Sequence, residues 1–155
     1  MLNQIYKKLR TLYINSDSIT QIEKKINYTF KDKELLRQAF THKSINNSPR
    51  FNYERLEFLG DSVLDIVISR ELMREFPDGD EGLLTQRRAA LVQKPFLANM
   101  GRLLSLMDYL KIEKNIDLSI DKIADKQIAN IFEALIGALY LDGGIRPCKV
   151  LILNT

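Results

Sequence analysis

The chain has 155 residues, of which 45% are hydrophobic and 28% are charged, as in a globular protein with a single domain's core and unlike a disordered chain. A single cysteine (Cys148) and a single histidine (His42) exclude an intrachain disulfide framework and metal sites built from several thiolates or imidazoles. The net charge of +3 is unevenly spread, because residues 1–50 carry ten basic and four acidic side chains whereas residues 51–100 carry six and nine. No apolar run approaches the ~20 residues of a membrane-spanning helix, so we expect a cytoplasmic protein without membrane contact.

Apolar residues recur at helical spacing along nearly the whole chain. The expected helices, in chain order, are residues 3–14, 19–26, 33–43, 52–76 and 83–93, one that starts near Pro95, then 127–142 and a short one over 147–153. We expect Ser16 to Ser18 to separate the first two helices, and Asp32 to cap the third. Residues 112–126 are polar and mixed. Because no stretch alternates long enough for a strand, the sequence predicts an all-α fold in one domain, with residues 1–18 as an extra leading helix.

Acidic residues occur within the otherwise apolar helix that is expected over residues 52–76. Glu54, Glu57 and Asp61 are spaced three and four apart, which places them within about 60° of one another on one helix face. The residues between and after them are apolar nearly all round, so the helix is expected to be mostly buried. Like charges repel at this spacing and buried carboxylates are costly to ionise, so the cluster indicates either a neutralising cation or a hydrated face.

Glu133 repeats this pattern in the most apolar helix of the chain, with Asn130 one turn before it. One interpretation is a buried carboxylate paired with an arginine, such as Arg55 or Arg88. The other is a shared set of oxygen ligands, from both acidic helices, for a hard cation. Few protein oxygens plus water suit Mg²⁺ or Mn²⁺, while Ca²⁺ remains open.

The run from Glu54 to Leu64, ERLEFLGDSVL, resembles the signature of the ribonuclease III family. Matches to other family blocks lie in family order along the chain, at residues 41–44 before the signature and at residues 80–92 and 132–142 after it. The resemblance therefore covers about residues 20–155 and marks residues 19–155 as the endonuclease domain. It implies a helical homodimer that cuts double-stranded RNA with Mg²⁺, leaving 5′-phosphate and 3′-hydroxyl ends with a short 3′ overhang. The implied role is RNA processing, with ribosomal precursors, messengers and foreign duplexes all open as substrates. Bacterial members usually continue into a double-stranded-RNA-binding domain, and no sequence like that domain is present here.

The resemblance also implies roles for individual residues. Asp61 and Glu133 would be catalytic, and the metal ligands, for Mg²⁺ or for Mn²⁺ as its substitute, would be Glu57, Asp61, Asn130 and Glu133. Glu54 and Glu81 would have supporting roles in the dimer valley, the groove between the two subunits of the homodimer. Phe58 would be an aromatic knob that enters the partner subunit, and Thr85 and Arg88 would face RNA. Ordinary core packing is the alternative for Phe58, and a solvated helix face is the alternative for Thr85 and Arg88. His42 is expected to be structural.

Asn130 departs from the family pattern, which usually has Asp-x-x-Glu where this chain has Asn130 to Glu133. A neutral amide oxygen then replaces a carboxylate, and a second metal should bind more weakly. We expect cleavage to be retained with a higher Mg²⁺ requirement. Two rival hypotheses stay open: an inactive or weakened RNA-binding protein on the same fold, and a helical scaffold whose acids are structurally paired and bind no Mg²⁺.

Overall fold

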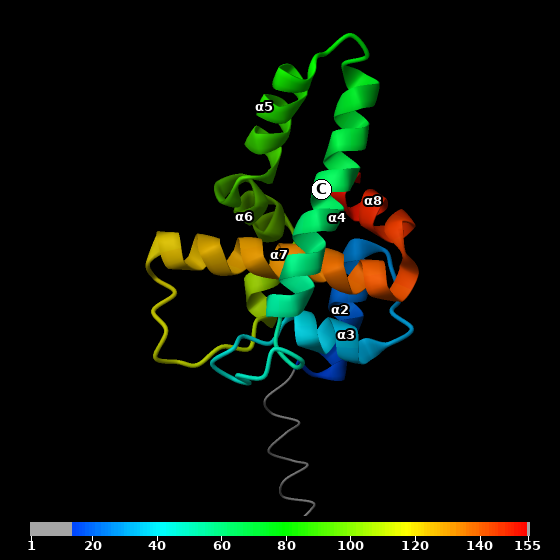
Figure 1. The fold of residues 1–155 in the computed structure, drawn as a ribbon. Coiled ribbons are helices and arrows are strands. Elements are labelled where there is room, and N and C mark those ends of the chain that lie inside the picture. Colours follow the sequence, from blue (N-terminus) through cyan, green and yellow to red (C-terminus); the bar gives the residue numbers. More distant parts are fainter. Residues whose placement is uncertain (1–13, 155) are drawn as a thin grey trace, which may run out of the picture.

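The computed structural model describes residues 14–154, and within them the secondary structure is helical apart from one isolated bridge between Thr41 and Lys111. The helices are α2 (Ser16–Ile26), α3 (Lys33–Ala39), α4 (Glu54–Glu75), α5 (Glu81–Val92), α6 (Lys94–Leu103), the 3₁₀ helix η1 (Leu106–Tyr109), α7 (Asp121–Gly143) and α8 (Ile145–Asn154) (Figure 1). The all-α prediction is confirmed. In this part of the chain, no helix combines the length and hydrophobicity needed to cross a membrane.

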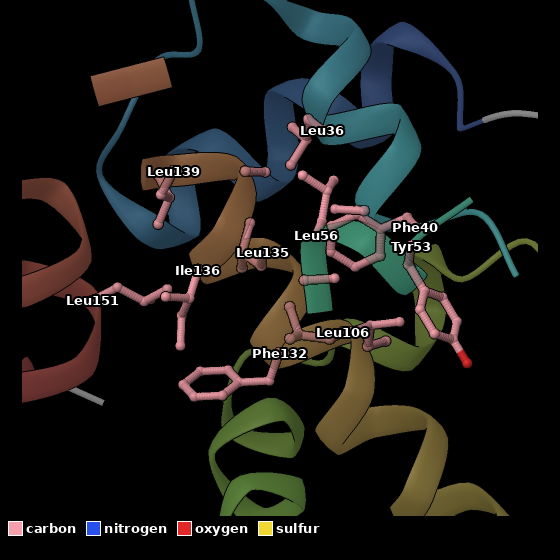
Figure 2. Close-up of a cluster of buried hydrophobic side chains, with 14 of the residues drawn as sticks. Leu36, Phe40, Tyr53, Leu56, Leu106, Phe132, Leu135, Ile136, Leu139 and Leu151 are labelled. Atoms are coloured by element: carbon pink, nitrogen blue, oxygen red, sulfur yellow. The ribbon is translucent and has the colours of Figure 1, made fainter. Parts of the chain in front are cut away.

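Helix α7 forms the centre of the molecule, and every residue from 127 to 139 is buried. Helices α4, α6, α3 and α8 pack around it, with α4 making the most extensive contact. Figure 2 shows this core, in which Phe132 and Leu135 of α7 lie among side chains such as Leu56 and Leu106. Burying large apolar side chains on all sides of one helix accounts for its nearly continuous hydrophobic sequence.

Two glycines let α4 and α7 approach almost to backbone contact. A Cβ atom added at Gly60 would overlap the carbonyl oxygen of Glu133 and lie 2.9 Å from the backbone nitrogen of Gly137. A Cβ added at Gly137 would overlap the carbonyl oxygen of Leu56. The crossing therefore requires hydrogen in place of a side chain on both helices, and it fixes the spacing of the residues around it.

Helix α4 is less buried than its apolar sequence predicts. Leu56, Val63 and Leu64 face the core, but Phe58 is 79% exposed and Ile66 is 62% exposed. In Figure 1 the later part of α4 rises with α5 above the remaining helices, and none of the residues of α5 is buried. The expectation of a mostly buried helix is therefore wrong, because α4 buries only one face and leaves large apolar side chains in solvent.

Local capping explains several helix starts. The side chain of Asn15 accepts a hydrogen bond from the backbone N–H of Ser18 (2.8 Å), so α2 begins at Ser16 and the expected break at residues 16–18 is wrong. The boundary drawn at residue 18 therefore falls inside α2, and the helix expected over 3–14 lies almost wholly outside the described residues. Asp32 caps α3 as predicted, through the backbone N–H of Glu34 (2.9 Å).

Other boundaries depend on distant contacts. Helix α3 ends at Ala39 instead of residue 43, because the backbone N–H of His42 donates to the carbonyl of Lys111 (2.9 Å) and Lys111 in turn donates to Phe40 (2.9 Å). His42 is buried, and its Nδ1 atom accepts a hydrogen bond from the backbone N–H of Ser44 (3.0 Å), which fits the expected structural role. Helix α7 begins six residues earlier than predicted, at Asp121.

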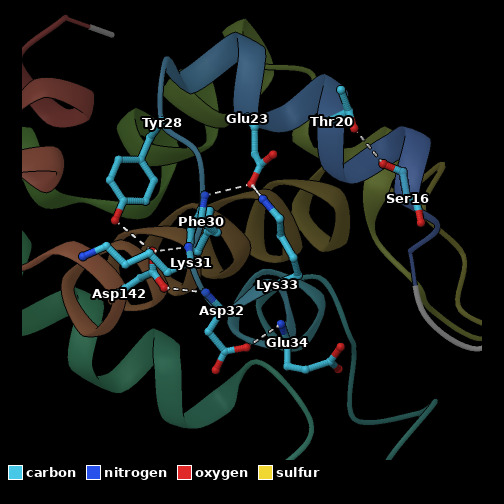
Figure 3. A network of polar contacts seen from close by, with 10 residues as sticks. All are labelled: Ser16, Thr20, Glu23, Tyr28, Phe30, Lys31, Asp32, Lys33, Glu34 and Asp142. Atoms are coloured by element: carbon cyan, nitrogen blue, oxygen red, sulfur yellow. Dashed lines mark hydrogen bonds and ion pairs between the residues drawn. The ribbon is translucent and has the colours of Figure 1, made fainter.

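Near the C-terminal end of α7, Asp142 holds the segment between α2 and α3 (Figure 3). Its carboxylate accepts hydrogen bonds from the Tyr28 hydroxyl (2.8 Å) and from the backbone N–H groups of Lys31 and Asp32 (2.9 Å each). Burial acts to raise the pKa of Asp142, but these hydrogen bonds outweigh it and keep that pKa below its ordinary value. The network anchors α7, and with it Glu133, against the N-terminal half of the described chain.

Candidate metal centre

At the crossing of α4 and α7, side-chain oxygens from both helices converge on one ammonium group. The Nζ atom of Lys94 donates to Glu133 Oε2 at 2.7 Å and to Asn130 Oδ1 at 2.9 Å, and it lies 3.5 Å from Glu57 Oε1. Glu57 belongs to α4, Asn130 and Glu133 belong to α7, and Lys94 begins α6. The structure thus brings three of the four predicted metal ligands together.

Lys94 occupies a position that a helix alone does not favour for a cation. It is the first residue of α6, and the N-terminus of a helix carries a partial positive charge. The two carboxylates compensate for this arrangement. Gln93 is the single residue between α5 and α6 and caps both helices, so the connection is tight and places Lys94 at the start of α6.

Burial dominates the electrostatics of the two carboxyl groups. Glu133 is only 3% exposed, and burial raises its pKa to about 7 although its contact with Lys94 acts in the opposite direction. The neighbouring charges of Glu57 and Asp61 raise the pKa of Glu133 further. Burial also raises the pKa of Glu57, again opposed by Lys94. Burial thus makes the charged form of both carboxyl groups more costly, so a bound cation would stabilise both of them.

Asp61 lies at the edge of this cluster. It is exposed on α4, one turn after Glu57, and its charge acts on Glu133. Within residues 14–154, no three acidic, histidine or cysteine side chains come close enough together to hold a metal ion as they are placed. Glu57 and Glu133 instead share the ammonium of Lys94.

A buried tyrosine orients the amide of Asn130. The Nδ2 group of Asn130 donates to the hydroxyl of Tyr53 (3.4 Å), and that hydroxyl donates to Gln127 Oε1 (2.8 Å). Burial raises the pKa of Tyr53 to about 12, so the hydroxyl keeps its proton. Because the amide nitrogen is engaged by Tyr53, the amide oxygen faces Lys94 and the predicted acids.

The structure corrects the predicted ion-pair alternative for Glu133. Its partner is Lys94, whereas Arg88 donates to Ser69 Oγ (2.9 Å) and Arg55 is exposed. Sequence reasoning missed Lys94, Tyr53 and Gln127. A lysine at a helix start, where the helix dipole disfavours it, was the available signal for Lys94.

In the described part of the chain, the remaining predicted polar residues make no hydrogen bond or ion pair with Lys94, although the charge of Glu54 helps to raise the pKa of Glu57. Glu54 lies 3.6 Å from the ammonium of Lys43, and Glu81 accepts a hydrogen bond from the hydroxyl of Thr85 (3.1 Å) at the start of α5. Among the described residues, no hydrogen bond or ion pair joins Glu81, Thr85 or Arg88 to Glu133. Their expected roles in the dimer valley and toward RNA remain predictions.

An apolar groove adjoins the first turns of α4. It has a volume of about 1010 Å³, and its lining includes Phe51, Leu59 and Leu141. Phe58 also lines it while exposing 79% of its surface, so the predicted core alternative for Phe58 does not hold. Exposed aromatic surface of this kind beside a groove is typical of an interaction surface.

Comparisons with known proteins match most of this chain and its fold. The family model for Ribonuclease-III-like domains matches residues 32–155. Ribonuclease 3 of Sulfurovum sp. (strain NBC37-1) is 41% identical over 130 residues, covering 84% of this chain and 57% of that protein. Ribonuclease 3 of Caldanaerobacter subterraneus subsp. tengcongensis is 42% identical over 139 residues, covering 88% of this chain and 61% of that protein. The chain thus spans about three fifths of the length of these curated relatives.

Solved structures of ribonuclease III proteins have the same fold as this chain. The nuclease domain of ribonuclease III from Campylobacter jejuni, in a structure concerned with flexibility in a region involved in dimer formation, superposes with a TM-score of 0.82 at 38% identity. That match covers 88% of this chain and 94% of the other. Dicer from Pichia stipitis matches with a TM-score of 0.56 at 32% identity, over 76% of this chain and 49% of the other. The chain therefore belongs to the ribonuclease-III-like family and contains its endonuclease domain.

Proposed function

We propose that this chain acts as a Mg²⁺-dependent endoribonuclease that hydrolyses double-stranded RNA to 5′-phosphate and 3′-hydroxyl ends, in cytoplasmic RNA processing. Family membership supports the reaction class. The observation that supports the metal dependence is that Glu57, Asn130 and Glu133 converge on one positively charged group, the ammonium of Lys94.

The donor chemistry of the cluster fits a hard divalent ion. Carboxylate and amide oxygens are the ligands that Mg²⁺ and Mn²⁺ take, and the ammonium of Lys94 marks the point where the cluster stabilises positive charge. Glu57, Asp61, Asn130 and Glu133 would hold the ion. A bound Mg²⁺ supplies activation of a water molecule and neutralisation of charge on the phosphate oxygens.

The chain's own residues divide the remaining work. The glycine crossing of α4 and α7 fixes Glu133 in a dry environment, and Tyr53 holds the amide of Asn130. Asp61 is exposed beside the half-buried Glu57 and the buried Glu133, so its carboxylate would be accessible to an ion that also contacts a substrate phosphate. The arrangement combines a rigid buried anion with an exposed one, which suits binding an ion that must also contact RNA.

We further propose that the chain forms a symmetric homodimer through the apolar groove. In a two-fold interface the same patch serves both subunits, so each Phe58 can enter the groove of its partner. Such a dimer would carry two metal centres, one for each strand of an RNA duplex.

Phe58→Glu should therefore convert the protein to a monomer, because it places a charge in an interface that Phe58 would otherwise fill with an apolar ring. Analytical ultracentrifugation measures the change. Met73→Glu is the matched control, since Met73 is 63% exposed on the same helix but does not line the groove. A dimer that survives Phe58→Glu, or one that Met73→Glu dissociates equally, would place the interface elsewhere.

A second candidate function is a weakened or inactive binder of double-stranded RNA. It is favoured by the low charge of the cluster, where Asn130 is neutral and Lys94 adds a positive charge. The proposed nuclease and this binder differ in their response to restored charge.

Asn130→Asp should lower the Mg²⁺ concentration that gives half-maximal cleavage by about tenfold, equivalent to ~1.4 kcal/mol of binding free energy, because ligand charge raises affinity for hard cations. Titrating Mg²⁺ against the cleavage rate of both proteins measures the difference. Superimposable titration curves would show that the charge at position 130 does not limit metal binding.

The decisive experiment for the proposed function incubates the chain with a long labelled RNA duplex at low salt, with and without Mg²⁺. Low salt is needed because phosphate contacts dominate the affinity of such a surface. Cleavage of the duplex with Mg²⁺, and none with a chelator or with a single strand, supports the nuclease. Binding without cleavage at any Mg²⁺ concentration supports the binder.

A further inference from the structure

We infer that Lys94 is a built-in cation of the metal centre, whose ammonium neutralises Glu57 and Glu133 until a divalent ion displaces it. This inference rests on the proposed metal-dependent function. It concerns a residue of α6 that is not among the ligands which sequence patterns indicate, and it assigns that residue a competing role.

The geometry makes the competition direct. The ammonium of Lys94 already uses Glu133 Oε2 (2.7 Å) and Asn130 Oδ1 (2.9 Å), and it lies 3.5 Å from Glu57 Oε1. A metal ion bound through these oxygens would stand about 2.1 Å from each, so the two cations would be only a few ångströms apart. Their repulsion in a partly dry site disfavours joint occupancy, so binding of the metal ion favours release of the ammonium.

Exposure shows which partner can leave. The side chain of Lys94 is 47% exposed, whereas that of Glu133 is 3% exposed. The flexible four-carbon stem of lysine can carry the ammonium into water without a change in the backbone of α6. Glu133 has no such freedom, because it belongs to the most buried stretch of α7.

Competition has two consequences. Without metal, the buried carboxylate keeps a partner and the crossing of α4 and α7 tolerates its charge. With metal, part of the binding free energy is used to displace the lysine. A higher metal requirement therefore arises from Lys94 in addition to Asn130.

Calorimetry with MnCl₂ and MgCl₂ on the full chain tests the inference. Lys94→Met removes the charge and keeps most of the stem, and we expect it to bind Mn²⁺ at least about tenfold more tightly than the wild type. Arg102→Met is the matched control. Arg102 lies on the same helix, is 46% exposed and pairs with Asp125 of α7, away from the carboxylates of the centre, so its loss should leave Mn²⁺ affinity unchanged.

Each outcome decides between the inference and the proposed function. Equal or weaker Mn²⁺ binding by Lys94→Met, with binding by the wild type intact, overturns the role of Lys94 and leaves the proposed function standing. An equal gain in Arg102→Met also overturns it, because general charge would then explain the effect. Absence of binding by every protein overturns both the inference and the metal dependence.

A measurement on the wild type keeps the test independent of the variant's folding. The side chain of Lys94 can be acetylated with a limiting amount of an amine-reactive reagent, and mass spectrometry then gives its labelling rate. This rate rises when the ammonium of Lys94 is released from its partners. Saturating Mn²⁺ should raise the Lys94 labelling rate several-fold, and the rate at Lys149, which pairs with Glu71 at 3.5 Å, should stay constant. An unchanged or lower rate at Lys94 overturns the inference.

Discussion

Glu133→Gln should abolish measurable Mg²⁺ and Mn²⁺ binding and lower duplex cleavage by at least about 100-fold. Substituting groups that merely support a metal ligand costs about 10–100-fold, and Glu133 is itself an expected ligand. Its carboxylate is the most deeply buried anion of the cluster and the closest to the cation that the structure places there, at 2.7 Å. Calorimetry and a cleavage assay on the purified variant measure the two losses.

Glu71→Gln is a suitable control for this substitution. Glu71 is also a largely buried glutamate, with 12% of its side chain exposed, and it pairs with Arg74 and Lys149 outside the centre. Its loss should leave metal binding unchanged. Metal affinity that survives in Glu133→Gln would move the centre away from α7 and contradict the proposed ligand set.

The pH dependence of stability provides a check that the Glu133→Gln variant is folded and that the carboxyl group is responsible. Burial raises the pKa of Glu133 from 4.5 to about 7, so the native state holds its proton more tightly than the unfolded chain. That contribution to stability is complete below the unfolded pKa and is lost as the pH rises through about 7. Denaturant unfolding in a chelator should show this loss in the wild type and not in the glutamine variant.

Local chemistry explains the parts of the fold that the sequence predicts well. Asp32 caps α3 through a backbone group two residues away, and the apolar run in α7 requires burial wherever that helix lies. Spacing along a single helix likewise places Glu57 and Asp61 on one face. Such features depend on neighbours in the chain, and a single sequence contains them.

Contacts between distant segments explain what the sequence did not reveal. The end of α3 is set by Lys111, which lies some seventy residues later, and the partner of Glu133 is a lysine that the α5–α6 connection delivers. Periodicity predicts that Glu133 needs a partner but cannot say which helix supplies it. The exposure of Phe58 could not be predicted for the same reason. An apolar pattern along a helix is the same whether that face packs in the core of its own chain or is left exposed for another contact.

The crossing of α4 and α7 is the feature on which both fold and centre depend, so Gly137→Ala should be among the most damaging small substitutions in the chain. The added Cβ would overlap the carbonyl oxygen of Leu56, and rigid helix backbones on both sides leave no flexible group to yield. We expect a loss of about 3 kcal/mol in the free energy of unfolding, at the upper end of the usual cost of overpacking.

Gly82→Ala is the control, since its added Cβ meets only Asp80 Oδ1, at 3.5 Å, on the exposed α5. It should leave stability unchanged or raise it by up to about 1 kcal/mol through helix propensity. Chemical denaturation measures both variants, and metal calorimetry on folded Gly137→Ala should also show weaker binding, because separating the helices moves Glu57 away from Glu133. A Gly137→Ala protein as stable as the Gly82→Ala control would mean that the two helices do not need this close approach.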